Sequence, residues 1–266
     1  LLENPNKEAE LLKVDAIDGI SNLIIASPEN FLPYLESFVP LIITQLQDSS
    51  TDITLTCPLL NCLGHIINLY AEQIKPLVGN IVPIVAQMSL KDLTPELNSL
   101  KEMEQQNVLP EDIDDNLETP IVRDALEIAG LAFMVYISLI RHNPELLPEC
   151  FENIVQIISQ NTKSIIDYTE RSVCKAIEII MQIVEETKFQ SPHFEQIYLS
   201  LMLILTKTRE ISVYGDALTA LASFIQVAGL EVLGAYVQTL PDEIDNILQC
   251  NIPLLQEDDQ DRIAEI

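Results

Sequence analysis

The segment LPYLESFVPLII, residues 32–43, is an apolar stretch with a proline near its start and a second proline seven residues later. The segment KPLVGNIVPIVA, residues 75–86, repeats this pattern with both prolines displaced by 43 residues. Similarity at a fixed spacing of about 20 to 50 residues is typical of proteins built from repeated structural units. The two copies therefore predict a helical-repeat protein.

The same spacing continues along the chain. Pro148 follows Pro76 by one period plus 29 further residues, which fit the acidic, turn-rich stretch 90–119. Two more steps of 43 residues reach Ser191 and Gly234. We therefore expect five units, the first and last incomplete, with an insertion after the second. Because the sequence starts and ends within a unit, we also expect a fragment of a longer protein.

Each unit is expected to contain two helices. Apolar residues three and four positions apart precede each proline-led segment, and this is a helical period, not a strand period. Strands are not expected, since no alternating run is bounded by hairpin turns and the chain has only 7 glycines. The fold class is therefore all-α. The predicted apolar stripes of the five first helices are Val14, Ile17, Ile20 and Ile24; Leu59, Leu63, Ile66, Ile67 and Tyr70; Ala125, Ile128, Ala132, Val135 and Leu139; Val173, Ile177, Ile180 and Val184; and Leu218, Leu221, Phe224 and Ile225.

The prolines are expected to have two roles. Pro33, Pro76 and Pro148 fit the first turn of a helix, where the missing N–H has no intrahelical acceptor to lose. Pro40 and Pro83 fall within apolar periodicity, where a proline removes one backbone hydrogen bond and bends the axis. We therefore expect a kinked second helix in the first two units.

Composition predicts a folded and strongly acidic protein. Hydrophobic residues make up 48% of the chain, which is enough for a large core. The 41 acidic and 14 basic residues give a net charge of -27, so the protein would repel the phosphates of nucleic acids. A basic protein partner fits this charge better. The acidic excess also serves solubility alone, and that alternative stays open.

Neither a membrane span nor a secreted protein is expected. The longest apolar run, residues 128–140, is shorter than the roughly 18 to 20 residues that a span requires. No N-terminal signal segment is visible. The 5 cysteines are scattered and mostly embedded in apolar helix faces, as in reduced intracellular proteins.

No constellation of catalytic residues is visible. The only histidines are His65, His142 and His193, and no two have the spacing of a zinc-binding helix. Cys57 and Cys62 lack a second pair of ligands. Neither a glycine-rich phosphate loop nor a Gly-x-Ser-x-Gly turn occurs. We therefore expect that the protein is not an enzyme and holds no metal or cofactor.

The two-helix unit with its paired prolines resembles the HEAT repeats of the importin-beta, or karyopherin, family. The resemblance covers Val14 to Leu90, and weaker matches are VRDALEIAG at 122–130 and GDALTAL at 215–221. Asp48 fits the aspartate that often follows the second helix, but Thr54 stands where many HEAT units have an arginine. The hydrogen-bonded ladder of HEAT repeats is therefore expected to be partial.

This resemblance implies a right-handed α-α superhelix, a HEAT-repeat solenoid of about five helix pairs. Units 1 and 2 would occupy residues 1–90, an acidic insertion or loop 91–119, and units 3 to 5 with the start of a further unit 120–266. It also implies a nuclear transport receptor in cytoplasm and nucleus that binds basic protein cargo, the small GTPase Ran and phenylalanine-glycine nucleoporins. The alternative is a general HEAT scaffold, or a regulatory subunit of a phosphatase or ubiquitin-ligase assembly.

Two features are candidates for partner binding. The insertion carries five carboxylates within eight residues, which either capture a lysine-rich segment or form an ordinary solvated loop: Glu111, Asp112, Asp114, Asp115 and Glu118. Small residues of the first helices either leave grooves for phenylalanine side chains or allow close helix packing, and packing is favoured: Ala129, Gly130, Ala132, Ala220 and Ala222. A second acidic cluster is interpreted as the turn before a further unit: Glu257, Asp258, Asp259 and Asp261.

Overall fold

The structure is a computed structural model that describes residues 5–48, 53–90, 120–162, 167–208 and 211–231. Every regular element in these ranges is a helix and none is a strand, so the all-α prediction is confirmed for them. The chain divides into two compact units, Leu1–Asn143 and Pro144–Ile266. None of the helices described is both long and apolar enough to cross a bilayer.

Among its described residues, the first unit has three long first helices and two shorter second helices. The first helices are α1 (Pro5–Ala26), α4 (Ile53–Leu69) and α8 (Pro120–His142). The second helices are α3 (Leu35–Gln47) and α6 (Val78–Ser89). A one-turn helix and a 3₁₀ turn precede each second helix: α2 (Pro28–Phe31) with η1 (Leu32–Tyr34), and α5 (Ala71–Ile74) with η2 (Lys75–Leu77).

The bounds of these elements recur at the predicted spacing. The end of α1, both ends of α2 and η1, and the start of α3 each reappear 43 residues later, in α4, α5, η2 and α6. We call the connecting segments, residues 27–34 and 70–77, the corners. The 43-residue period in the sequence is therefore a period of the structure in the first unit.

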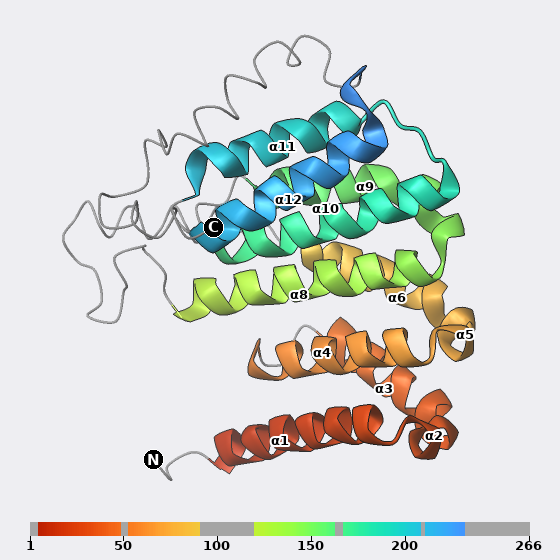
Figure 1. Ribbon diagram of the computed structural model, residues 1–266. Coiled ribbons are helices and arrows are strands. Elements are labelled where there is room, and N and C mark those ends of the chain that lie inside the picture. The colour runs from red at the N-terminus through yellow and green to blue at the C-terminus, as the bar shows by residue number, and fades with distance from the viewer. Residues whose placement is uncertain (1–4, 49–52, 91–119, 163–166, 209–210, 232–266) are drawn as a thin grey trace, which may run out of the picture. The chain divides into compact units, whose positions relative to one another are not determined.

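The first helices of this unit pack side by side. α4 contacts α1 and α8, and it lies between them in Figure 1. The second helices α3 and α6 contact each other, and each also contacts the first helix that follows it. The predicted stripe on α4 is buried over its whole length, since Leu59, Leu63, Ile66, Ile67 and Tyr70 are at most 4% exposed.

The corners are tied to each other by one hydrogen bond. The hydroxyl of Tyr70, in the second corner, donates to the carbonyl oxygen of Pro28, in the first, at 2.7 Å. Tyr70 is 4% exposed, and its burial raises the pKa of the phenol. The bond satisfies a hydroxyl that would otherwise be costly to bury, so it also fixes the distance between the two corners.

The prolines differ in part from their predicted places. Pro148 lies in the first turn of its helix, as predicted. Pro33 and Pro76 lie one step earlier, in the 3₁₀ turns η1 and η2, because a fixed φ suits a 3₁₀ turn as well as a helix start. Pro40 and Pro83 lie inside α3 and α6, as predicted, while the bend that they should cause stays a prediction.

The second unit has the same alternation of long and shorter helices. It contains η3 (Pro144–Leu146), α9 (Leu147–Asn161), α10 (Asp167–Thr187), α11 (Phe194–Lys207) and α12 (Ile211–Ala228). The first helices α10 and α12 contact each other, and α11 contacts α9 and α12 (Figure 1). Aromatic rings connect these helices through the core: the centroid of Phe194 lies 5.6 Å from that of Phe151 and 6.3 Å from that of Phe224.

The predicted stripes of α8 and α10 are buried in the same way, except for Ala125, whose side chain lies outside the described part of the structure. On α8, Ile128, Ala132, Val135 and Leu139 are at most 6% exposed, and on α10, Val173, Ile177, Ile180 and Val184 are at most 2% exposed. On α12, Leu221 and Phe224 are buried, while Leu218 and Ile225 are half-buried. The helical period thus predicted the core-facing positions of these first helices.

Two glycines give a test of the helix geometry. Gly64 lies within α4, and a Cβ built there would meet Cγ2 of Val135 on α8 at 3.7 Å, an ordinary contact. We expect Gly64→Ala to raise the free energy of unfolding by about 1 kcal/mol, since alanine restricts the unfolded chain and fills this contact.

Gly229 is the control, because it follows α12 with a φ of 80° and its N–H bonds the carbonyl of Ile225 at 3.0 Å. Gly229→Ala should cost about 1 to 2 kcal/mol, as an L-residue disfavours this conformation. Urea denaturation followed by circular dichroism measures both changes. A destabilised Gly64→Ala variant would mean that α4 and α8 lie closer together than described.

Candidate protein-interaction surfaces

The predicted acidic site lies outside the described residues. Glu111, Asp112, Asp114, Asp115 and Glu118 all belong to the range 91–119, and the second acidic cluster belongs to 232–266. By sequence, 91–119 has nine carboxylates and two lysines, and 232–266 has eight carboxylates and one arginine. These two ranges therefore carry about half of the net charge of -27.

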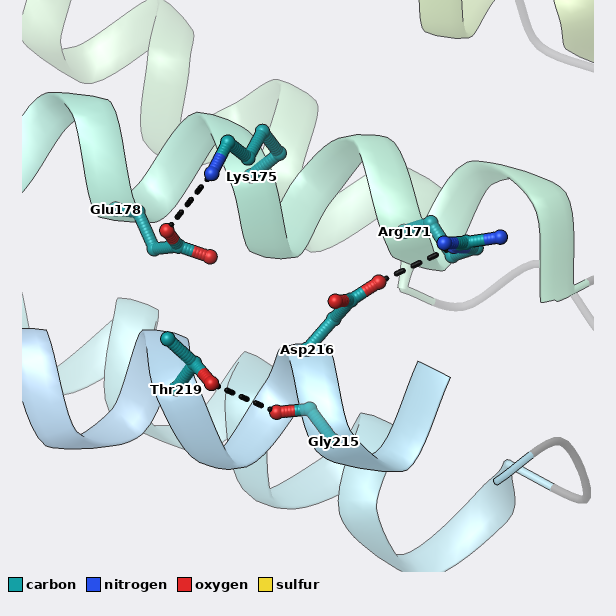
Figure 2. A network of polar contacts seen from close by, with 6 residues as sticks. All are labelled: Arg171, Lys175, Glu178, Gly215, Asp216 and Thr219. Atoms are coloured by element: carbon teal, nitrogen blue, oxygen red, sulfur yellow. Dashed lines mark hydrogen bonds and ion pairs between the residues drawn. The ribbon is translucent and has the colours of Figure 1, made fainter. Parts of the chain in front are cut away.

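The second unit presents a charged surface on α10 and α12. Nε of Arg171 lies 3.1 Å from Oδ2 of Asp216, which joins the two helices, and Nζ of Lys175 lies 3.0 Å from Oε2 of Glu178 within α10 (Figure 2). The side chains of Arg171 and Asp216 are 55% and 42% exposed, so their attraction contributes well under about 1 kcal/mol. The ion pair therefore adds little to the stability of the fold and mainly holds the two side chains together at the surface.

Burial and nearby carboxylates together raise the pKa of a thiol beneath this surface. The thiol of Cys174 on α10 is fully buried, and burial is the largest cause that raises its pKa to about 12. The charges of Asp216, Glu170 and Glu178 act in the same direction. The ionised thiol is therefore disfavoured first by burial and then by the nearby negative charges.

Sequence reasoning did not predict this cluster. Arg171 and Asp216 are 45 residues apart, close to one repeat period, and this spacing was the available signal. The ion pair joins two successive first helices. The aspartate–arginine ladder expected from the resemblance was instead sought after a second helix, at Asp48 and Thr54. Opposite charges about one period apart on successive first helices are therefore worth searching for in helical repeats.

The first corner carries an aromatic cluster. The ring of Phe31 lies 5.5 Å from that of Phe38, 6.3 Å from that of Tyr34 and 6.4 Å from that of Tyr70, measured between centroids. Phe31 and Tyr70 are buried, but Tyr34 is 62% exposed. Leu32 and Leu41, on η1 and α3, are 42% and 61% exposed. This is exposed apolar surface of the kind that partners cover.

The small residues pack helices. Ala129, Ala132 and Ala220 are at most 2% exposed and Gly130 is buried, whereas Ala222 is exposed. The four buried residues support the packing interpretation at their own positions.

The three histidines lie at different places in the fold and have different surroundings. Nε2 of His142, at the end of α8, lies 3.2 Å from Oδ1 of Asn68 on α4, and burial together with Arg141 lowers the pKa of His142. His65 lies within α4, and His193 precedes α11 as its N-cap residue. Within the part of the chain that is described, no group of three histidine, cysteine or carboxylate side chains could hold a metal ion.

The high pKa of Cys174 has a measurable consequence. At pH 8 a thiol with a pKa of about 12 is ionised to only about one part in ten thousand, so it should resist alkylation in the folded protein. Cys57, which is half-buried, should react with iodoacetamide at least about tenfold faster. Peptide mass spectrometry after timed labelling measures each site. Equal rates at both cysteines would show that the negative, buried environment of Cys174 is wrongly described.

Comparison of this chain with protein-family models, with curated proteins and with solved structures gives no match. The functional interpretation therefore rests on the repeat, the charge and the surfaces described above.

Proposed function

We propose that this chain is a segment of a nuclear transport receptor, a HEAT-repeat solenoid of the karyopherin kind that binds basic protein cargo and Ran. Its helix pairs stack into a right-handed superhelix, and its sites of action are the cytoplasm and the nucleus. The observation that carries this proposal is the recurrence of the whole corner, element by element, after 43 residues.

The recurrence supports a solenoid because the first two helix pairs, with their corners, are copies of the same building block. Identical corners place successive second helices in the same relation to their first helices, so the units add along one direction. A chain of this kind has a long surface and a core made of nearest-neighbour contacts. Such surfaces bind extended or bulky protein partners.

Charge supports a basic partner. The net charge of -27 attracts lysine- and arginine-rich segments and speeds their encounter with the protein. The carboxylates at residues 111–118 are the densest acidic cluster of the predicted insertion. Phenylalanine-glycine nucleoporins complete the set of partners that the proposed role requires.

Ran tests the proposal most directly. The full chain should bind GTP-loaded Ran at least about tenfold more tightly than GDP-loaded Ran, a difference of about 1.4 kcal/mol, measured by isothermal titration calorimetry. A transport receptor must sense the nucleotide, because cargo exchange depends on it. Equal affinities would instead indicate a general HEAT scaffold.

The acidic cluster is tested by removing its charge. Replacing Glu111, Asp112, Asp114 and Asp115 by glutamine or asparagine should weaken binding of a lysine-rich peptide by about tenfold or more and flatten its dependence on salt. Fluorescence anisotropy at several salt concentrations measures both effects.

A matched control is the same change of four charges in the second cluster, at Glu257, Asp258, Asp259 and Asp261. This control removes the same number of negative charges, but it should change the affinity for the lysine-rich peptide little. If both variants lose the same affinity, the binding depends on total charge and the cluster at 111–118 is not a specific site.

A further inference from the structure

One face of α1 is exposed although it carries only apolar and small residues. Leu12 and Leu23 are 69% and 53% exposed, and Ala16 and Gly19 between them are exposed as well. Spacings of four, three and four residues put these four positions on one side of the helix. A Cβ built at Gly19 would meet nothing within 4 Å, so the space beside it is open.

The 43-residue period gives every position on this face a counterpart in α4. The counterparts of Leu12, Ala16, Gly19 and Leu23 are Leu55, Leu59, Cys62 and Ile66. All four counterparts are buried, with exposed fractions of 7% or less. The same side of the helix is therefore covered in one copy of the repeat and bare in the other.

Cys62 identifies the neighbour that covers this side of α4. Ser21 and Asp18 of α1 both lie close enough to Cys62 to act on the pKa of its thiol. The opposite side of α4 faces α8, as the contact between Gly64 and Val135 shows. The side of α4 that matches the bare face of α1 is thus the side that receives a preceding first helix.

The second helices show the same difference. On η1 and α3, Tyr34 and Leu41 are 62% and 61% exposed, whereas their counterparts Leu77 and Ile84 are half-buried. Phe38 is half-buried, whereas its counterpart Ile81 on α6 is 1% exposed. The contrast thus extends over both helices of the unit.

We propose that this surface receives a further helix pair of the same repeat, in the way that α4 and α6 receive α1 and α3. We call it the outer face and define it by Leu12, Ala16, Gly19 and Leu23 of α1 with Tyr34 and Leu41. The proposal rests on the solenoid proposed above, but not on Ran or cargo binding.

The required partner surface identifies the occupant. By the repeat, the incoming first helix presents the counterparts of Val14, Ile17, Ser21 and Ile24, an apolar stripe with one small polar residue. The α1 helix of a second copy cannot offer that stripe, because α4 covers it. The occupant is therefore a further repeat unit with its own free stripe.

An extended chain tests the proposal. A second copy of residues 10–52, inserted in register before residue 10 of the full chain, supplies such a helix pair. The added pair should fold onto the outer face, raise the thermal midpoint by a few degrees and resist chymotrypsin, whose sites at Phe31, Tyr34 and Phe38 the substitutions below leave unchanged. An added pair that is cleaved as fast as an unfolded segment would overturn the proposal.

Substitutions in the extended chain identify the surface used. Leu12→Lys with Leu23→Lys in the downstream copy, whose outer face receives the added pair, should lower the thermal midpoint by about 5 °C and speed cleavage of the added pair about tenfold. The same two substitutions in the upstream copy, whose outer face is free, form the matched control and should change neither. Equal effects in the two copies would contradict stacking on the outer face.

Sedimentation of the unextended chain tests the other possible occupant of the outer face, a second copy of this chain. Its sedimentation coefficient should be that of a monomer, with or without the two substitutions. A dimer that Leu12→Lys and Leu23→Lys dissociate would assign the outer face to a second copy and overturn the proposal. Loss of Ran discrimination without any change in these results would affect the proposed function alone.

Discussion

Side-by-side packing of the first helices is the contact on which the rest of each unit depends. In the first unit α4 buries one side against α1 and the other against α8, so its stripe is closed to solvent along its length. At Gly64 the two helices leave room for a Cβ, which would meet Val135 at an ordinary 3.7 Å. Second helices then cover what remains apolar. In such an arrangement each helix pair buries its apolar surface against the neighbouring pairs. The protein can therefore become longer without forming one large core.

The corners turn this packing into a repeat. A short helix, a 3₁₀ turn and a proline form one rigid connection, and both copies have it at the same place. Because φ is fixed at the proline, the second helix leaves each corner in a set direction. Aromatic rings around Phe31 fill the inside of the first corner. Two corners with the same elements give two helix pairs with the same arrangement, and this repetition is the basis of the proposed receptor.

Local signals in the sequence predicted the helices, the period and the buried stripes, since helical spacing and prolines act within a few residues. The exact place of Pro33 was missed, because a 3₁₀ turn and a first helical turn accept the same φ. The ion pair of Arg171 with Asp216 was missed as well, because no apolar period constrains charged positions on a surface. Exposure of Leu12 depends on a neighbour that the pattern of α1 cannot specify. The predicted binding carboxylates at 111–118 lie outside the described residues, so that prediction stays open.

The hydrogen bond from Tyr70 to Pro28 has a mechanical consequence. It holds two successive corners at a fixed separation on one edge of the first unit. Bending that keeps this bond would leave the corner edge in place and would displace the far ends of α1 and α4 the most. A partner bound at those far ends would then bend the unit most effectively, because its force would act nearly a full helix length from the corner edge.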